Sequence, residues 1–118
     1  MRRLLFLFRR APYGSLASRE GLDAVLAGAA FEIPMTLLFD GDGVLLLLKG
    51  QDPATIGMKS VGAAFEALPM FDIEDLRVHG PSLAACGLAP KDLILPVQIV
   101  DDTDVQRLIR EADQVLSF

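Results

Sequence analysis

The chain has 118 residues, of which 52% are hydrophobic, and it carries a formal net charge of −5. This length predicts one domain over residues 1–118, the apolar content excludes an intrinsically disordered chain, and the acidic balance argues against nucleic-acid binding through a general basic field. One cysteine and one histidine exclude an intramolecular disulfide framework, a cysteine-based zinc cluster and a multi-histidine metal site.

The first third of the chain alternates between buried strands and a helix. Residues 4–8 form a continuous apolar run, which is typical of a parallel strand covered on both faces. The run is too short for a signal-peptide core and charge follows it, so we expect a cytoplasmic protein. Helical spacing of apolar residues predicts a helix over about 16–30, and residues 35–39 form a second apolar run that predicts a strand.

The sequence Asp40-Gly41-Asp42-Gly43 is a strong turn signal after the second strand. An EF-hand is excluded because two of its required ligand positions fall on Val44 and Gln51. The nucleotide-binding glycine motifs do not occur, so residues 40–43 predict a tight loop at the carboxyl edge of the sheet. Residues 44–48 fit a hairpin strand or a short helix, and their leucine content favours the helix.

The rest of the chain continues this alternation. The expected elements are a helix over 58–68 ended by Pro69, a strand over 76–78, a helix from Gly80-Pro81 to Gly87, a strand over 93–100 containing Pro96, a final helix capped by Thr103 with Gln106, and a strand over 115–118. The order predicts an α/β fold: a single three-layer domain with a mostly parallel sheet of about five strands and helices on both faces.

His79 and Cys86 are the residues whose chemistry needs an explanation. His79 lies between a predicted strand and a helix start, which favours a capping or interface role over that of a general base. Cys86 lies at the far end of the same helix, and no second cysteine exists to resolve a disulfide, so we expect a structural thiol. Ser15 and Ser18 lack a nucleophile-elbow motif and are expected to cap the first helix.

The apolar content exceeds what one small domain is expected to hide, and exposed apolar patches mark subunit interfaces. The alternative is that all of these side chains belong to the core. The interface candidates come from segments 44–48 and 68–71, and they are Leu45, Leu46, Leu47, Leu68, Met70 and Phe71.

Five segments together resemble the TusC/DsrF branch of the DsrE/DsrF/DsrH sulfur-relay family, over essentially the whole chain. They are Ala11–Gly14, Ser18–Ala24, Phe39–Val44, Leu68–Glu74 and Asp113–Phe118. The resemblance implies a DsrE/F-like fold and a heterohexamer with TusB-like and TusD-like subunits. That complex would accept persulfide sulfur from a TusA-like carrier and pass it to a TusE-like carrier for tRNA 2-thiouridine synthesis. The related branch implies sulfur oxidation instead.

The resemblance also bears on the site residues. The acceptor cysteine of the family follows a strand at the start of a helix that ends in glycine. If that glycine is Gly87, the acceptor position is His79, and Cys86 does not match the motif. The resemblance therefore implies a non-catalytic subunit, and the residue counts and missing motifs lead us to expect neither a cofactor nor a metal. Two alternatives stay open: a sulfur acceptor that uses Cys86, and a flavodoxin-like module that binds a small molecule at residues 40–43.

Overall fold

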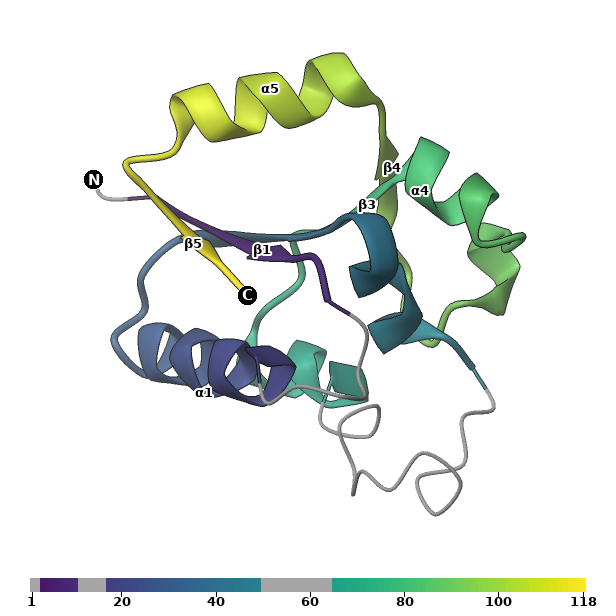
Figure 1. The fold of residues 1–118 in the computed structure, drawn as a ribbon. Helices are drawn as coiled ribbons and strands as arrows, with labels where there is room; N and C mark the ends of the chain where they lie inside the picture. Colours follow the sequence, from purple (N-terminus) through teal and green to yellow (C-terminus); the bar gives the residue numbers. More distant parts are fainter. Residues whose placement is uncertain (1–2, 11–16, 50–64) are drawn as a thin grey trace.

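A five-stranded sheet in the order β4-β3-β2-β1-β5 forms the centre of the protein, and every neighbouring pair of strands is parallel (Figure 1). The computed structural model describes residues 3–10, 17–49 and 65–118. The strands are β1 (Leu4–Phe8), β2 (Met35–Phe39), β3 (Leu76–His79), β4 (Gln98–Val100) and β5 (Gln114–Ser117). The predicted parallel α/β sheet is therefore confirmed.

Helices cover both faces of this sheet. The helices whose bounds fall within the described residues are the α-helices α1 (Ala17–Ala30), α4 (Gly80–Ala85) and α5 (Asp102–Glu111) and the 3₁₀ helices η1 (Gly41–Leu47), η2 (Leu68–Phe71) and η3 (Pro90–Asp92). Figure 1 shows α5 on one face and α1 on the other. Within the described parts of the chain, no helix combines the length and the apolar character that a membrane span requires.

The continuous apolar strands supply both layers of the core because successive side chains of a strand point to opposite faces. Phe6 and Phe8 of β1 belong to the larger cluster, which α1, η1, η2 and α4 complete. Leu5 and Leu7 belong to the smaller cluster, which α5 covers with Leu108. Burial on both sides is the reason that these strands read as unbroken apolar runs.

An aromatic cluster fills the larger core layer. The ring of Phe8 stacks on Phe39 with 5.2 Å between centroids and meets the edge of Phe65 at 5.3 Å. Phe118 stacks on Phe8 at 5.8 Å. Its backbone is also tied to β1, because the amide of Phe118 donates to Leu7 and its carbonyl accepts from the amide of Arg9, both at 2.8 Å.

The segment over 44–48 forms most of the 3₁₀ helix η1, so the helix that its leucines favoured is confirmed and the hairpin alternative is wrong. The chain tightens to 3₁₀ geometry directly after Asp40. At the end of η1, Leu48 makes an isolated antiparallel bridge with Leu93. That bridge joins η1 to the segment before β4 and not to β2, so it is not part of the predicted hairpin.

Two predicted boundaries were wrong. The expected helix over 58–68 lies mostly outside the described residues; Phe65 and Glu66 are helical, and Pro69 follows them in the first turn of η2, where its missing amide costs nothing. The strand expected over 93–100 is confined to β4, which is an edge strand as Pro96 suggested. The cap of α5 is formed by Asp101 and Asp104, two residues before the predicted Thr103.

Candidate functional site

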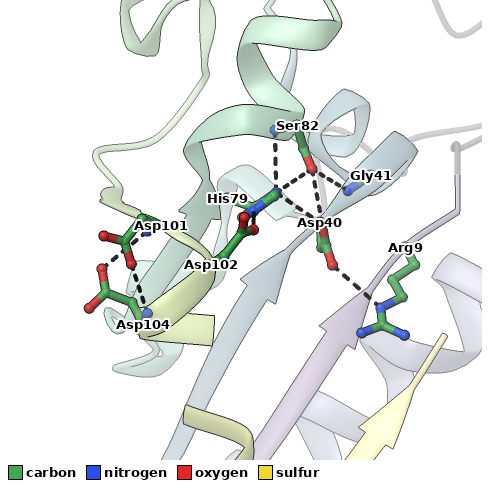
Figure 2. A network of polar contacts seen from close by, with 8 residues as sticks. All are labelled: Arg9, Asp40, Gly41, His79, Ser82, Asp101, Asp102 and Asp104. Atoms are coloured by element: carbon green, nitrogen blue, oxygen red, sulfur yellow. Dashed lines mark hydrogen bonds and ion pairs between the residues drawn. The ribbon is translucent and has the colours of Figure 1, made fainter. Parts of the chain in front are cut away.

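The carboxyl ends of four adjacent strands each bring one polar side chain to the same edge of the sheet. Parallel strands end together at this edge, where open α/β folds place their sites. The four side chains follow the spatial order of the strands, from β4 to β1, and they are Asp102, His79, Asp40 and Arg9. Figure 2 shows that they lie side by side with Ser82 of α4 among them.

His79 uses both ring nitrogens. Nε2 lies 2.5 Å from Oδ1 of Asp102, and Nδ1 lies 2.6 Å from Oγ of Ser82. The backbone amide of Ser82 also points to Nδ1 at 3.3 Å, so His79 is the N-cap of α4. The side chain is 13% exposed. The predicted capping role of His79 is therefore confirmed, and its ring has no nitrogen left for a ligand.

The hydroxyl of Ser82 connects His79 to the loop after β2. It accepts a hydrogen bond from the backbone amide of Gly41 at 2.8 Å and donates to Oδ1 of Asp40 at 2.9 Å. The other carboxylate oxygen of Asp40 pairs with Arg9 at 3.6 Å. The contacts therefore run without interruption from the end of β1 to the start of α5 (Figure 2).

Counting protons distinguishes two arrangements of this network. A proton must lie between Nδ1 of His79 and Oγ of Ser82, because two acceptors would repel each other at 2.6 Å. If the hydroxyl supplies it, Oδ1 of Asp40 loses its donor from Ser82. If the ring supplies it, Ser82 donates to Asp40 and Asp102 accepts from Nε2, so each of these three contacts has its own proton. The amide of Ser82 can donate to Nδ1 only in the first arrangement, whereas the 3.2 Å contact between Asp40 Oδ1 and Nδ1 suits the second, so the heavy-atom distances fit both.

The order Ser82, His79, Asp102 has the connectivity of a hydrolytic triad, but the hydroxyl is not free to attack a substrate. A nucleophilic serine needs a hydroxyl whose proton passes to the histidine. Here the Ser82 oxygen is held at once by Gly41, Asp40 and His79. The arrangement is suited to fixing the positions of α4 and of the strand ends.

The described side chains of this network include no thiol. Among the residues that the structure describes, no group of three or more histidine, cysteine, aspartate or glutamate side chains is placed to hold a metal ion. Cys86 lies at the opposite end of α4 from His79, where it is half-buried and packs against the larger core cluster. This position agrees with the structural role expected for the thiol.

Glycine is favoured at positions 41 and 43 for two different structural reasons. Gly41 has a φ of 56°, in the left-handed region that favours glycine. A Cβ on Gly43 would lie 1.7 Å from the backbone oxygen of Phe8, so the chain passes directly against the end of β1. Residues 40–43 lie at the carboxyl edge as predicted, but 41–43 form the first turn of η1 and not a loop; backbone conformation at Gly41 and close packing at Gly43 account for the two glycines.

Sequence reasoning found His79 and Asp40 but missed three partners, which are Arg9, Ser82 and Asp102. The available signal was position, since each lies within a few residues of a strand end. Ser15 and Ser18 were the residues predicted to cap α1. Ser15 lies outside the described residues, and Ser18 is buried with no hydrogen-bond partner for its hydroxyl within them. The structure thus gives no support for capping by Ser18.

The predicted interface residues divide into two groups. Leu46, Leu47 and Leu68 are 1%, 0% and 0% exposed, so they belong to the core of this chain and cannot offer a surface to a partner. They are buried because η1 and η2 close the larger core layer. Leu45 is half-buried. Met70 and Phe71, in contrast, are exposed by 84% and 54%.

Comparison with known sequences identifies the family. The sequence model of the DsrE/DsrF-like family matches residues 2–118. The chain belongs to the DsrE/DsrF-like family. The sulfur-relay family expected from the sequence is thereby confirmed, and the family match covers the polar network, η1 and η2 alike.

Individual members of the DsrE/DsrF-like family are similar over the full chain. A TusC homolog of Vibrio parahaemolyticus is 42% identical and covers 100% of both chains, and one of Pseudomonas aeruginosa is 41% identical and covers 98% of this chain and 97% of its own. The intracellular sulfur oxidation protein DsrF of Allochromatium vinosum is 34% identical, over 100% of this chain and 97% of its own. The crystal structure of the ychN protein from E. coli covers both chains completely with a TM-score of 0.85, and at 23% identity it supports the fold alone.

Replacing Ser82 by alanine in this DsrE/DsrF-like chain is expected to lower the free energy of unfolding by about 1–2 kcal/mol, because Gly41 and Asp40 each lose a partner. Urea denaturation measures the change. Ser117→Ala, at an exposed position in β5, is the control and should stay within about 0.5 kcal/mol of the original chain. Equal stability of the two variants would mean that the network does not stabilise the fold.

Proposed function

We propose that this chain is a non-catalytic subunit of a TusBCD-type sulfurtransferase complex, which relays persulfide sulfur for 2-thiouridine synthesis at the tRNA wobble position. The similarity to TusC homologs over the whole chain carries this proposal. The DsrF relative supports sulfur oxidation as the second candidate, and its lower identity makes that the less favoured one.

The polar network supports a subunit that does not carry sulfur itself. A sulfur acceptor needs an accessible thiol, whereas the end of β3 presents an imidazole with both nitrogens engaged. Cys86 packs against the core at the other end of α4. The role that remains is to assemble the complex and to help shape the surroundings of a partner's reactive cysteine, in the cytoplasm.

Assembly can be tested first. The tagged chain, recovered from an extract of its own cells, should appear in native mass spectrometry with a TusB-like and a TusD-like chain in equal number, as a heterohexamer with two copies of each. A monomer or a homo-oligomer in the same extract would contradict the proposal. The TusA-like and TusE-like carriers are expected to meet this complex only through the subunit that carries the acceptor cysteine.

The Cys86→Ser variant tests whether the chain itself accepts sulfur. We expect the reconstituted complex containing it to transfer labelled persulfide sulfur to tRNA at the original rate, because the thiol is half-buried against the core. The positive control is a complex whose TusD-like subunit has lost its acceptor cysteine, which should transfer none. Loss of transfer by an intact Cys86→Ser complex would favour the independent acceptor instead.

A further inference from the structure

A groove lies at the amino edge of the sheet, away from the polar network. It has a volume of about 500 Å³ and runs between the end of α1, the start of β2 and the segment after η2. Its lining includes Arg3, Glu32, Met35, Phe71, Asp72 and Glu74. No residue of the polar network lines it, so it needs an explanation of its own.

The groove is strongly acidic. Four carboxylates line it, from Glu32, Asp72, Glu74 and Asp75, against the single guanidinium of Arg3. Asp75 is occupied, since it accepts from Thr36 at 2.6 Å and from Arg77 at 2.9 Å. Among the described residues, none of the other three carboxylates makes an ion pair. Three negative charges are therefore available to an occupant.

The same groove is bordered by exposed apolar surface. The ring of Phe71 is 54% exposed in the wall, and Met70 beside it is 84% exposed. Met35 and Ile33 are half-buried in the lining. Exposure of two large apolar side chains next to each other is typical of surface that is covered in an assembly. An occupant must therefore present apolar groups as well as positive charge.

Two of the free carboxylates are on backbone that side chains rarely adopt. Glu32 has a φ of 57° and Asp72 a φ of 62°. Glycine takes this left-handed conformation without the steric penalty of a Cβ. Replacing either residue by glycine therefore removes a carboxylate from the groove and relieves the backbone at the same time. This separates an effect on docking from an effect on folding.

We infer that this groove docks a protein segment of a partner subunit in which lysine or arginine side chains lie beside apolar ones. Charge complementarity with the three free carboxylates selects the basic groups, and Met70 and Phe71 bury the apolar ones. The inference rests on the proposed function, because the partner is taken to be the TusB-like or the TusD-like chain.

The test uses the full chain with a double substitution, Glu32→Gly and Asp72→Gly, mixed with the purified TusB-like and TusD-like chains. Affinity for the partners should fall about tenfold, and the dependence of affinity on NaCl concentration should become weaker. The melting temperature of the isolated variant should be unchanged or higher, because the left-handed strain is relieved. The neutral pair Glu32→Gln and Asp72→Asn should weaken docking in the same way.

The matched control removes two negative charges elsewhere on α1, through Glu20→Gln and Asp23→Asn. Both control residues are exposed, and neither lines the groove. The control variant should bind the TusB-like and TusD-like chains with the same affinity as the original chain. An equal loss in control and groove variants would overturn the inference, since general charge and not the groove would then drive association.

The remaining outcomes are distinct. If the original chain binds the partners and the groove variants bind them as tightly, the groove inference fails and the proposed function stands. If the original chain binds neither partner, the proposed function fails and the inferred occupant with it. If the groove substitutions abolish self-association of the chain but not partner binding, the occupant is a second copy, and the inference is overturned.

Discussion

Replacing Gly43 by alanine is expected to lower the free energy of unfolding by about 3 kcal/mol or more. The added Cβ would lie 1.7 Å from the carbonyl oxygen of Phe8 and 2.4 Å from its carbonyl carbon. Both atoms belong to the backbone of β1, so no side-chain rotation can relieve the contact. Either η1 or the end of β1 must move, and both are part of the larger core layer.

The midpoint of urea denaturation, compared at constant slope, measures this effect. Gly87→Ala is the matched control, because Gly87 has a φ of 72° and no heavy atom within 4 Å of an added Cβ. Its free energy of unfolding should fall by only about 1 kcal/mol, the cost of placing a residue with a Cβ in the left-handed conformation. Similar losses of stability in the two variants would show that contact with the backbone of Phe8 does not limit substitution at Gly43.

Leu46→Ala is expected to destabilise the isolated chain by about 2–5 kcal/mol, the range for a buried leucine whose site collapses only partly. The side chain is 1% exposed and lies in the larger core cluster. Met70→Ala is the control, because that side chain is 84% exposed. It should change stability by no more than about 0.5 kcal/mol.

The two variants should also differ in assembly. Met70→Ala should keep its melting temperature and weaken the complex with the partner subunits, since the loss is confined to surface. Leu46→Ala should lose stability whether or not partners are present. A stable Leu46→Ala chain that no longer assembles would restore the original interpretation of segment 44–48 as an interface.

The sequence was most informative where burial is strongest. Residues 4–8 and 35–39 are apolar at every position but Thr36 because they lie between two layers, and this predicted both the strands and their parallel pairing. Gly80-Pro81 and Gly87 predicted the two ends of α4. Proline fits the first turn of a helix, where no amide has to donate, and Gly87 takes the left-handed conformation just past the helix end. Local rules of this kind do not depend on the rest of the fold.

The site and the surface could be predicted only in part because they depend on tertiary placement. Arg9, Asp40 and His79 are tens of residues apart, and only the order of the strands brings them together. The leucines of 44–48 have the same composition whether they face a partner or their own core. Their burial is decided by how η1 packs against the sheet and α4, which composition does not encode.

The position of Phe118 has a further consequence for ligand binding. From β1 the chain proceeds to β2, β3 and β4 on one side and then returns through α5 to β5 on the other, so β1 and β5 form the topological switch point of the sheet. Doubly wound proteins open a nucleotide crevice there, because successive loops diverge. Here the ring of Phe118 packs on Phe8 and lies so close to α1 that a Cβ on Gly21 would be 2.7 Å from it. Phe118 therefore packs against the core at the edge where such proteins bind their ligand, and a ligand that contacts Phe8 or Gly21 from that side would have to displace the ring.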